Sequence, residues 1–315
     1  MNGGGVPLLT ARHVREAVSP ARAVEAVRDA FVAHARGEWT MPSKVYVPAY
    51  PAGDFRAMPA LGDGHALLKW ITSFPGNPAQ GLPTVMGVVL VSDASNGTLE
   101  AILDAASVTA LRTGAAAVLA AETLGRDDAD SAAVIGAGVN GRAVAATFLA
   151  RGRDVLLWDV DESRARSAAA ELGAEVAASR DAAFGADLLV TVTPGHELLL
   201  DGGSLRAGQH VSLMGADGPG KAEMAVAELA RVRVFCDEWE QASHYGDIAR
   251  AVEEGVLRRE DVTELGSVLT GEAPGRTSPE ESTAFDSTGL AIQDLAIAIA
   301  ALERLDELDV PRLEL

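Results

Sequence analysis

The spacing of apolar residues predicts two kinds of structure in the N-terminal half of the chain. Val24, Val27 and Phe31 recur three or four positions apart, which indicates one face of a helix that begins at Ser19–Pro20. Farther on, short apolar or alternating runs are separated by glycine and proline, as in the strands of a sheet. These predicted strands cover residues 44–49, 55–60, 66–73, 84–92 and 99–103, with a hairpin signal at 95–97.

The second half alternates apolar strands with helical segments. An alanine-rich helix, with Ser107 as its candidate cap, is expected to end near Leu124, and a linker at 125–130 follows. An apolar helical tail, 287–308, is expected to return to the first domain. The remaining predicted strands are 132–135, 155–158, 188–192, 211–214 and 232–235, and the predicted helices are 139–151, 161–172, 222–230 and 239–254. This alternation predicts an α/β fold with a doubly wound parallel sheet of the Rossmann type.

A glycine pattern stands at the first of these strand-to-helix turns. Gly136, Gly138 and Gly141 form G-x-G-x-x-G between the run AAVI and a predicted helix. In such a turn the first glycine permits the tight bend, the second lets a pyrophosphate approach the backbone, and the third lets helix and strand pack closely. The helix start also offers N–H groups and a partial positive charge to phosphates. We therefore predict a dinucleotide site here.

Polar residues at the ends of two other predicted strands bear on the cofactor. Asp159 stands 18 residues after Gly141. A carboxylate there accepts hydrogen bonds from the adenosine ribose and repels a 2′-phosphate, which favours NAD over NADP; the alternative is that Asp159 only caps the next helix. Thr191 and Thr193 either line the ligand crevice at the strand end or cap the turn before Pro194.

The composition narrows the class of protein. Of the 315 residues, 48% are hydrophobic, which is enough for a sizeable core in two domains, and the formal net charge is −19. This charge argues against nucleic-acid or anionic-membrane partners, which need clustered Lys and Arg. No uncharged apolar run reaches about 18 residues and the first residues lack a secretory pattern, so we expect a cytoplasmic protein without membrane helices. The single cysteine, Cys236, is expected in the core.

Three basic residues lie inside apolar runs of the first half, namely Arg56, Lys69 and Arg112. A buried cation needs a partner. Either each cation forms an internal salt bridge with an acid of the chain, or together they bind the carboxylate of a ligand, which Arg contacts bidentately. Because no acid lies in the same runs, an anionic ligand is favoured. A lysine near other cations has a lowered pKa, which makes Lys69 a candidate proton carrier.

Asp217 is the acid in the glycine- and proline-rich loop SLMGADGPGK (212–221), which follows a predicted strand. It either binds an ammonium group or exchanges a proton with water, or it caps the turn; Lys221 is expected to pair at the loop edge. The histidines lack metal-ligand spacing, and no G-x-S-x-G or Cys–His signature is present. We therefore expect neither a metal site nor a hydrolytic nucleophile.

Several longer stretches resemble the ornithine cyclodeaminase/mu-crystallin family. They run from about residue 41 to 294 and include MPSKVYV, FRAMPA, LLKW, PGNPAQGLPTVM, LRTGAA, VIGAGVNG, GADGPGK and FDSTGLAIQD. Within the family, the sequences of these stretches are most similar to those of archaeal-type NAD-dependent alanine dehydrogenases. The resemblance implies a homodimer. It also implies a substrate-binding and dimerisation domain, 1–124, completed by the C-terminal helix, 295–315, and an NAD-binding Rossmann domain, 125–294.

The resemblance further implies roles for individual residues. Lys69 would be the catalytic proton carrier and Asp217 the catalytic aspartate, and Arg112 would lie where the substrate meets the nicotinamide. The candidate substrate contacts are Arg56, Lys69 and Arg112. The candidate cofactor contacts are Thr84, Arg112, Thr113, Gly136, Gly138, Val139, Asn140, Gly141, Asp159, Thr191, Thr193, Met214 and Gly215.

These residues favour an NAD-dependent oxidoreductase that acts on the CH–NH2 or C=N group of a small L-amino acid or imine, as an alanine dehydrogenase or a ketimine reductase does. Two other functions stay open. A cyclodeaminase would close a diamino acid into a ring, but the cyclodeaminases resembled here carry glutamate where this chain has Arg56. A non-catalytic NAD-binding protein, like mu-crystallin, would have no need for Lys69 and Asp217 together.

Overall fold

The computed structural model describes residues 5–315, which form two compact units. Unit 1 contains the chain up to Arg112 together with Leu290–Leu315, and unit 2 contains Thr113–Gly289. The change from one unit to the next lies within helix α3 (Ala105–Leu124), whereas the sequence places the domain boundary at the end of that helix. Residues 1–4 lie outside the described residues, and the expectation that the first residues form no secretory signal falls partly on them.

Unit 1 is built on a seven-stranded sheet with the order β15–β1–β6–β5–β4–β3–β2. Strands β2 to β6 pair antiparallel in sequence order, and β1 pairs parallel with β6. The five strands predicted for this half are confirmed, whereas β1 and β15 escape prediction because they are short. The bounds are β1 (Val6–Leu9), β2 (Val45–Ala49), β3 (Gly53–Gly62), β4 (His65–Ser73), β5 (Val85–Asp93), β6 (Leu99–Asp104) and β15 (Arg312–Leu313).

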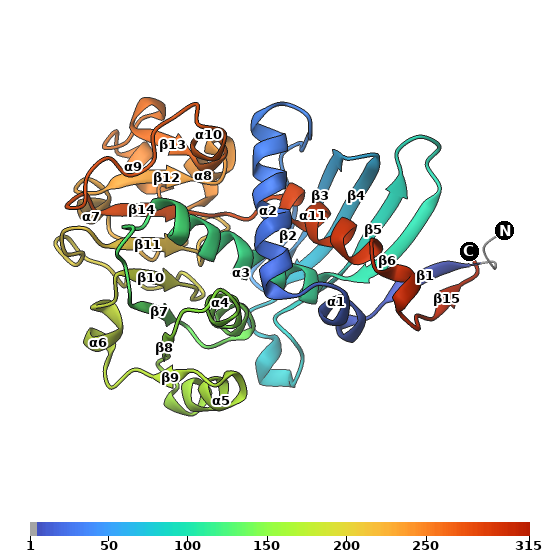
Figure 1. Ribbon diagram of the computed structural model, residues 1–315, viewed down its shortest axis with the longest axis horizontal. Helices are drawn as coiled ribbons and strands as arrows, with labels where there is room; N and C mark the ends of the chain where they lie inside the picture. The colour runs from blue at the N-terminus through green and yellow to red at the C-terminus, as the bar shows by residue number, and fades with distance from the viewer. Residues whose placement is uncertain (1–4) are drawn as a thin grey trace. The chain divides into compact units, whose positions relative to one another are not determined.

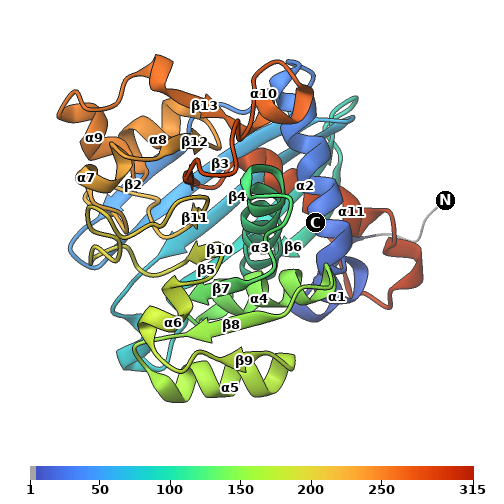
Figure 2. The same ribbon diagram turned by 60° about the vertical axis from the view of Figure 1, so that its left-hand side comes forward.

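Helices α1 (Ala11–Ala17), α2 (Pro20–Ala35) and α11 (Ala291–Leu302) accompany this sheet. The Ser19 hydroxyl accepts a hydrogen bond from Arg22 N at 3.2 Å and Pro20 takes the first helical position, which confirms the predicted helix start. As expected for the C-terminal tail, α11 returns to pack against α2 and against strands β3 and β4 (Figure 1 and Figure 2). Short 3-10 turns occur at Asn77–Gln80 and Leu305–Glu307.

The two faces of this sheet have different surroundings. Along β4, Leu67, Lys69 and Ile71 are buried, whereas Leu68 and Trp70 between them are 38% and 39% exposed. Since side chains alternate between the faces of a strand, one face is sealed and the other presents apolar side chains to solvent. Lys69 is therefore built into the sealed face.

Unit 2 contains an eight-stranded sheet with the order β13–β12–β14–β11–β10–β7–β8–β9, and every strand pair is parallel (Figure 1). The predicted doubly wound α/β fold is confirmed. The strand order reverses between β7 and β10, which is where such sheets open their ligand crevice. The strands are β7 (Ala132–Ile135), β8 (Val155–Trp158), β9 (Glu175–Val176), β10 (Leu188–Thr191), β11 (His210–Leu213), β12 (Arg233–Cys236), β13 (Val262–Glu264) and β14 (Thr283–Asp286).

The helices of unit 2 follow the predicted alternation, with differences at the C-terminal side. After α3 come α4 (Val139–Ala150), α5 (Glu162–Leu172), α6 (Arg180–Phe184), α7 (Val226–Leu229), α8 (Trp239–Tyr245), α9 (Ala249–Glu253), a 3-10 turn (Arg259–Asp261) and α10 (Leu265–Thr270). Cys236 is fully buried, as expected.

Three sequence predictions are corrected by local contacts. Ser107 does not cap α3 but lies within it, and Asp104 accepts the hydrogen bond from Ser107 N at 2.7 Å. The predicted helix 239–254 is divided at Gly246, where a Cβ would lie 2.1 Å from the Asp286 carboxylate. The predicted helix 222–230 shortens to α7 because the preceding backbone bonds to other side chains, including that of Asp247.

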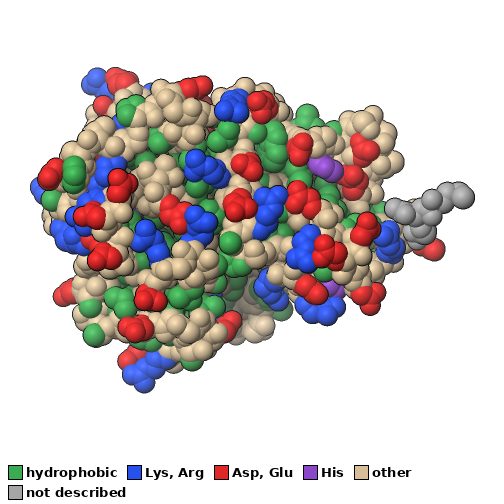
Figure 3. Space-filling view, viewed as in Figure 1, with side chains coloured by type: hydrophobic (Ala, Val, Ile, Leu, Met, Phe, Trp, Pro, Cys, Tyr) green, Lys and Arg blue, Asp and Glu red, His purple; other side chains and the backbone are tan. Residues whose placement is uncertain are grey.

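On the face shown in Figure 3, acidic and basic side chains are interspersed rather than gathered by sign. Although the chain has a net charge of −19, this face therefore carries side chains of both signs. Among residues 5–315, no helix combines the length and the apolar character that a membrane crossing requires.

Candidate active site

The loop after β7 has the backbone that a dinucleotide cradle needs. Gly136 has φ of +106°, in the region that favours glycine. A Cβ at Gly141 would lie 1.7 Å from the carbonyl oxygen of Gly136, so glycine is required for α4 to pack this closely. Gly138 is exposed and a Cβ there would meet nothing within 4 Å. With Val139 70% exposed and Asn140 half-buried, the first turn of α4 is open and fits a pyrophosphate.

Asp159 follows β8 and is bound to the glycine loop. Its Oδ2 accepts a hydrogen bond from Ala137 N at 2.7 Å, and its Oδ1 accepts one from Asp161 N at 2.9 Å. Arg164 Nη1 lies 3.4 Å from both carboxylate oxygens. The cap of α5 is Asp161, which accepts hydrogen bonds from Ser163 N and Arg164 N, so capping does not explain Asp159. Its carboxylate instead joins the end of β8 to the glycine loop, and its contact with a ribose stays a prediction.

In unit 1, Lys69 lies in a buried cluster of charges. Its Nζ is 2.6 Å from Oδ2 of Asp294 on α11, and the two side chains are 1% and 0% exposed. The hydroxyl of Thr109 is 3.4 Å from the same nitrogen. Arg112 on α3 approaches the other oxygen of Asp294, with Nε at 3.7 Å from Oδ1. Because one carboxylate serves two cations, this group keeps a positive charge that an anion can neutralise.

The surroundings of Lys69 change its acidity. Burial lowers the pKa of Lys69 to about 8; the charge of Asp294 opposes this shift, and the charges of Arg112 and Arg56 add to it. A lysine with such a pKa changes its charge in mildly basic solution. Lys69 is therefore suited to accept a proton from a substrate ammonium group and to return it.

Arg112 keeps donors for a ligand. Its Nη1 lies 3.4 Å from Oε1 of Gln293, and its Nε has no hydrogen-bond partner within the part of the chain that the structure describes. The guanidinium carries five N–H donors in a fixed plane. It thus has the free hydrogen-bonding capacity that a substrate carboxylate needs.

Arg56, on β3, forms a salt bridge within its own strand. Its Nε is 2.6 Å and its Nη2 3.3 Å from the two oxygens of Asp54, and both side chains are buried. No acid lies in the same apolar runs as the cations, but internal salt bridges, the alternative that the sequence leaves open, are present: Asp54 pairs with Arg56 and Asp294 with Lys69. A ligand carboxylate at this cluster would bind beside these internal ion pairs rather than in their place.

Asp294 is the member of the cluster that the sequence analysis does not single out. It stands in the otherwise apolar run of α11 and is fully buried. The three cations are recognised as charges inside apolar runs, and the same criterion applied to the C-terminal helix identifies Asp294.

In unit 2, Asp217 lies in the loop after β11. Lys221 Nζ is 2.6 Å from Asp217 Oδ1, and the Asp217 side chain is 35% exposed, so Lys221 is the loop-edge partner that the sequence predicts. Met214 and Gly215, which precede Asp217, are buried. Met214 N donates to the carbonyl oxygen of Thr191 at 2.8 Å, which holds this loop against the end of β10.

Thr191 and Thr193 both bond to one buried acid. The hydroxyl of Thr191 donates to Oε2 of Glu223, and that of Thr193 donates to Oε1, each at 2.7 Å. Thr191 is fully buried and its hydroxyl serves Glu223, so a contact of Thr191 with the cofactor stays a prediction. Thr193 is half-buried and accepts a hydrogen bond from Gly195 N at 3.3 Å, so it caps the turn, and its contact with the cofactor stays a prediction.

The two remaining threonines of the predicted set lie elsewhere. Thr113 on α3 is buried, and its hydroxyl has no hydrogen-bond partner among residues 5–315. Thr84 precedes β5 and is half-buried, and its carbonyl oxygen accepts a hydrogen bond from Phe74 N at 2.8 Å. Thr113 has an unused hydroxyl for a ligand, and Thr84 stays a predicted contact.

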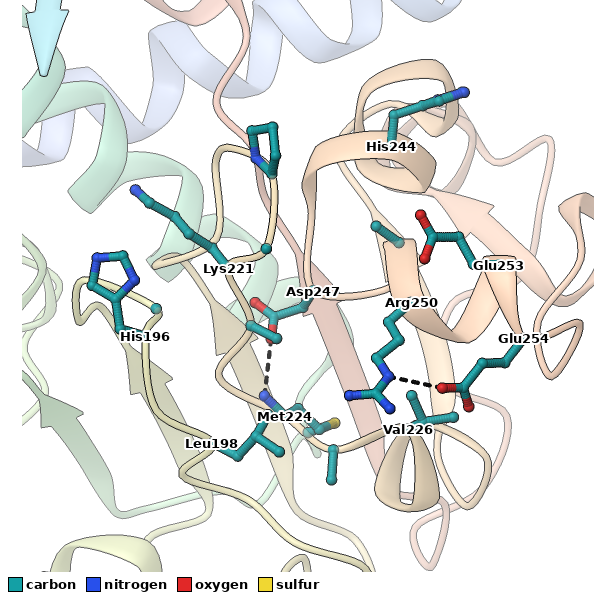
Figure 4. A pocket seen from close by; sticks show the side chains of 16 residues that line it. His196, Leu198, Lys221, Met224, Val226, His244, Asp247, Arg250, Glu253 and Glu254 are labelled. Carbon is teal, nitrogen blue, oxygen red and sulfur yellow. Dashed lines mark hydrogen bonds and ion pairs between the residues drawn. The ribbon is translucent and has the colours of Figure 1, made fainter. Parts of the chain in front are cut away.

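A cavity of about 580 Å³ lies within unit 2, beside the loops that follow β10 and β11 (Figure 4). Lys221 and His196 border one side, Arg250 pairs with Glu254 at 2.7 Å, and the buried Asp247 forms part of the wall. The glycine loop after β7 does not line this cavity, which is therefore separate from the dinucleotide cradle. No group of three or more His, Cys, Asp or Glu side chains in the range 5–315 is arranged to hold a metal ion.

Comparison with known proteins adds independent evidence. A model of the ornithine cyclodeaminase/mu-crystallin family matches residues 7–308. An alanine dehydrogenase of Archaeoglobus fulgidus is 40% identical over 306 residues, which are 94% of this chain and 94% of the relative. A solved archaeal alanine dehydrogenase dimer with bound NAD superposes with a TM-score of 0.91 at 38% identity, covering 98% of each chain.

A third relative has a different reaction. The solved Δ1-pyrroline-2-carboxylate reductase of Thermococcus litoralis, in complex with NADH and L-proline, has a TM-score of 0.91 at 27% identity, covering 98% of this chain and 100% of that one. The predicted family is thus confirmed, and these relatives include both an alanine dehydrogenase and a Δ1-pyrroline-2-carboxylate reductase.

Proposed function

Because the chain belongs to the ornithine cyclodeaminase/mu-crystallin family, we propose that it is an NAD-dependent oxidoreductase that acts on the CH–NH2 group of a small L-amino acid, as alanine dehydrogenase does. In the forward direction, the amino acid, NAD⁺ and water give a 2-oxo acid, ammonium, NADH and a proton. In the reverse direction, the same groups reduce a C=N bond.

The observation that carries this proposal is the buried group of Lys69, Asp294 and Arg112 in unit 1. The 2.6 Å contact between Lys69 and Asp294 fixes an amine whose pKa is lowered to about 8, and Arg112 lies beside it with Nε 3.7 Å from the same carboxylate. An α-amino acid presents one carboxylate and one ammonium group on adjacent atoms. This cluster matches that pair with a guanidinium and a proton acceptor.

The proton steps follow from this arrangement. Neutral Lys69 takes a proton from the substrate ammonium, and the resulting amine lone pair assists departure of the hydride from Cα. NAD, when bound, accepts that hydride. Arg112, with Arg56, holds the carboxylate and so fixes which Cα–H bond reacts, because orientation of the reacting atoms removes part of the barrier.

Hydrolysis of the resulting imine needs a second acid–base group. We assign this role to Asp217, the acid that the family resemblance places in catalysis. Asp217 takes a proton from the water that adds to the C=N carbon, and Lys69 returns its proton to the nitrogen of the resulting carbinolamine. The C–N bond then breaks, ammonia leaves, and the hydroxyl proton is lost to solvent as the C=O bond forms. Its 35% exposure gives water access to the carboxylate, and the ion pair with Lys221 fixes its position.

Unit 2 supplies the cofactor cradle in this proposal. Gly136, Gly138 and Gly141 leave room for the pyrophosphate, and Asp159 stands where the adenosine ribose is expected. The proposed remaining contacts are Thr84, Arg112, Thr113, Val139, Asn140, Thr193, Met214 and Gly215.

Reduction of an imine is the second candidate, since a relative with the same fold carries out that reaction. A diamino-acid cyclodeaminase is disfavoured, because Arg56 stands where those enzymes are expected to carry a glutamate, and Arg56 is paired with Asp54.

We further propose that two copies of the chain associate through the open face of the unit 1 sheet. This face presents a contiguous set of apolar side chains, namely Val45, Val47, Leu61, Leu68, Trp70, Met86 and Val88, each 38% to 56% exposed. Apolar patches of this kind mark interaction surfaces. The dimeric state of the archaeal relative supports the same assignment, and a cytoplasmic location is proposed with it.

The proposal is tested by mixing the protein with NAD⁺ and a panel of L-amino acids and by recording NADH absorbance. The reverse panel combines NADH with 2-oxo acids, with and without ammonium, and with cyclic imines. A dehydrogenase forms NADH in the first panel, whereas an imine reductase consumes it only in the second. Release of ammonia from ornithine with formation of proline and no net NADH would instead identify a cyclodeaminase.

A further inference from the structure

Glu223 is a fully buried acid of unit 2 that the reaction described above does not use. Its carboxylate accepts four hydrogen bonds. Oε1 accepts from the backbone and the hydroxyl of Thr193, at 2.8 and 2.7 Å. Oε2 accepts from the Thr191 hydroxyl at 2.7 Å and from Gly215 N at 2.8 Å. One side chain thus joins the end of β10 to the loop that follows β11.

The packing around Gly215 shows how closely this carboxylate is fitted. A Cβ at Gly215 would lie 2.5 Å from Cδ of Glu223 and 2.6 Å from the carbonyl oxygen of Thr193. Glycine at this position therefore lets the loop approach the carboxylate. Since Asp217 stands two residues farther along, the place where its backbone leaves the sheet is set by the contact between Gly215 and Glu223.

The backbone of Glu223 is held as firmly as its side chain. Its carbonyl oxygen accepts hydrogen bonds from Leu199 N at 2.7 Å and Leu200 N at 3.1 Å, and its N–H donates to Oδ1 of Asp247. The same carboxylate oxygen of Asp247 accepts from Met224 N at 2.9 Å (Figure 4). Asp247 thus holds the backbone of Glu223, whereas the crevice loops bond to the side chain of Glu223.

We propose that Glu223 is a positioning residue for the cofactor crevice, because it fixes the backbone at 193–195 and at 214–217 by bonds to Thr193 and Gly215. The inference rests on the proposed function, which places the cofactor and Asp217 at these two segments. The ligand that Glu223 serves is the dinucleotide, and it does so without touching it.

Four donors meeting one buried carboxylate stabilise its ionised form. Burial raises the pKa of Glu223, and the hydrogen bonds from Thr193, Thr191 and Gly215 oppose that shift. A glutamine side chain has the same size, but its amide accepts hydrogen bonds at the oxygen and donates them at the nitrogen. The amide nitrogen would therefore face two N–H or O–H groups that donate to the carboxylate in the wild-type protein. Glu223→Gln therefore breaks the junction between the two loops while keeping the volume of the side chain.

Glu228 provides a matched control in the same unit. It is also fully buried, and its carboxylate accepts hydrogen bonds from Gly203 N and from Leu205 N at 2.7 Å, in a loop outside both crevice segments. Glu228→Gln makes the same chemical change at a buried carboxylate that accepts two hydrogen bonds where Glu223 accepts four. A purely structural role for Glu223 predicts the same behaviour for both variants.

The experiment compares wild type, Glu223→Gln and Glu228→Gln by amide hydrogen exchange and by NADH fluorescence titration. In Glu223→Gln we expect exchange to rise about tenfold or more in peptides covering 193–200 and 214–222, and the Kd for NADH to rise by a similar factor. In Glu228→Gln we expect both quantities to stay within twofold of wild type at these segments. If Glu223→Gln is not folded, Thr191→Val, which removes one of the four donors, is expected to give a smaller change in the same direction.

Unchanged exchange in the two segments, or an unchanged Kd for NADH in a folded variant, would overturn the inference, as would equal effects of the two glutamine variants. These readouts are separate from turnover. Absence of amino-acid oxidation by the wild-type protein would contradict the proposed function while the binding and exchange measurements still decide the role of Glu223.

Discussion

Lys69 Nζ lies 2.6 Å from Asp294 Oδ2, with both side chains shut off from solvent. The strand β4 contributes the amine, and the helix α11, more than two hundred residues later in the sequence, contributes the carboxylate. The return of the C-terminal helix to unit 1 therefore supplies a charge to the candidate catalytic group as well as apolar packing.

Replacement of Asp294 by asparagine should lower the pKa of Lys69 below about 8, because the charge of Asp294 raises it whereas burial, Arg112 and Arg56 lower it. If neutral Lys69 is the reactive form, kcat/KM for amino-acid oxidation increases with pH as Lys69 loses its proton. In the asparagine variant this increase should occur at lower pH. The measurement is the pH profile of kcat/KM for both proteins. A profile that stays in place, or moves to higher pH, would contradict this relationship between the two residues.

Replacement of Gly138 or Gly141 by alanine should separate cofactor binding from folding. Gly138 has φ of −70° and open space for a Cβ, so Gly138→Ala should keep its melting temperature while NADH binding weakens about tenfold or more. Gly141→Ala places its Cβ 1.7 Å from a carbonyl oxygen and should lower the melting temperature by several degrees. Calorimetry and NADH titration check the pair, and equal behaviour of the two variants would be inconsistent with the glycine roles described.

Replacement of Asp159 by alanine should reduce the preference for NADH over NADPH. The change removes the carboxylate expected at the ribose and leaves Arg164 without the partner that lies 3.4 Å away. The ratio of the Kd for NADPH to the Kd for NADH should fall about tenfold or more, mainly because NADH binds less well. In the control Arg164→Ala, the ratio should instead stay or rise. A fall of the ratio in the arginine variant would speak against this account.

Replacement of Asp247 by asparagine should change how stability depends on pH. Burial and the charge of Glu223 raise the pKa of Asp247 from 3.8 to about 7. The folded protein holds this proton more tightly than the unfolded chain, so the stability from Asp247 is complete below about pH 4 and is lost as pH rises to about 7. The neighbouring acid Asp286 also has a raised pKa, chiefly from burial and from the charge of Asp247.

The difference in free energy of unfolding, variant minus wild type, should therefore be more favourable to the asparagine variant at pH 8 than at pH 5, by about 1 kcal/mol or more. Urea unfolding at the two pH values measures it. A difference that is constant with pH, or that changes in the opposite direction, would show that Asp247 does not hold a proton in the folded state.

Replacement of Trp70 by glutamate should dissociate the proposed dimer, because the charge would stand in the apolar open face of the unit 1 sheet. Val160, which is 84% exposed in unit 2, gives a control substitution to glutamate outside this face. Size-exclusion chromatography with light scattering should show a dimer for wild type and for the Val160 variant and a monomer for the Trp70 variant. A wild-type monomer would contradict the proposed assembly.

The sequence predicts the parts of the fold that depend on local pattern. The glycine loop needs only three glycines between a strand and a helix, and the strands β2 to β6 need only alternation and turns. The charged cluster is different, because the partners of Lys69 and Arg112 come from α11, and no local signal brings residue 294 to residue 69. Asp54, two positions before Arg56, lies just outside the apolar run that contains Arg56.

The role of Thr191 is hidden from the sequence for a similar reason. A threonine at the end of a parallel strand stands in the right place for a ligand, but its rotamer is decided by Glu223, an acid in an irregular segment 32 residues later. The predicted helix 239–254 likewise depends on packing, since Asp286 lies against Gly246 and accepts a hydrogen bond from Ile248 N where the chain passes from α8 to α9.

The central claim, that Lys69 carries the proton in an NAD-dependent reaction of an amino acid, is tested most directly by Lys69→Met measured beside the double variant Lys69→Met/Asp294→Asn. The double variant removes the buried pair together and leaves no unpaired carboxylate beside the methionine. We expect both variants to bind NADH within threefold of wild type and to lose at least about a hundredfold in kcat for the amino acid that wild type oxidises. Turnover in the folded double variant within a few-fold of wild type would contradict the claim.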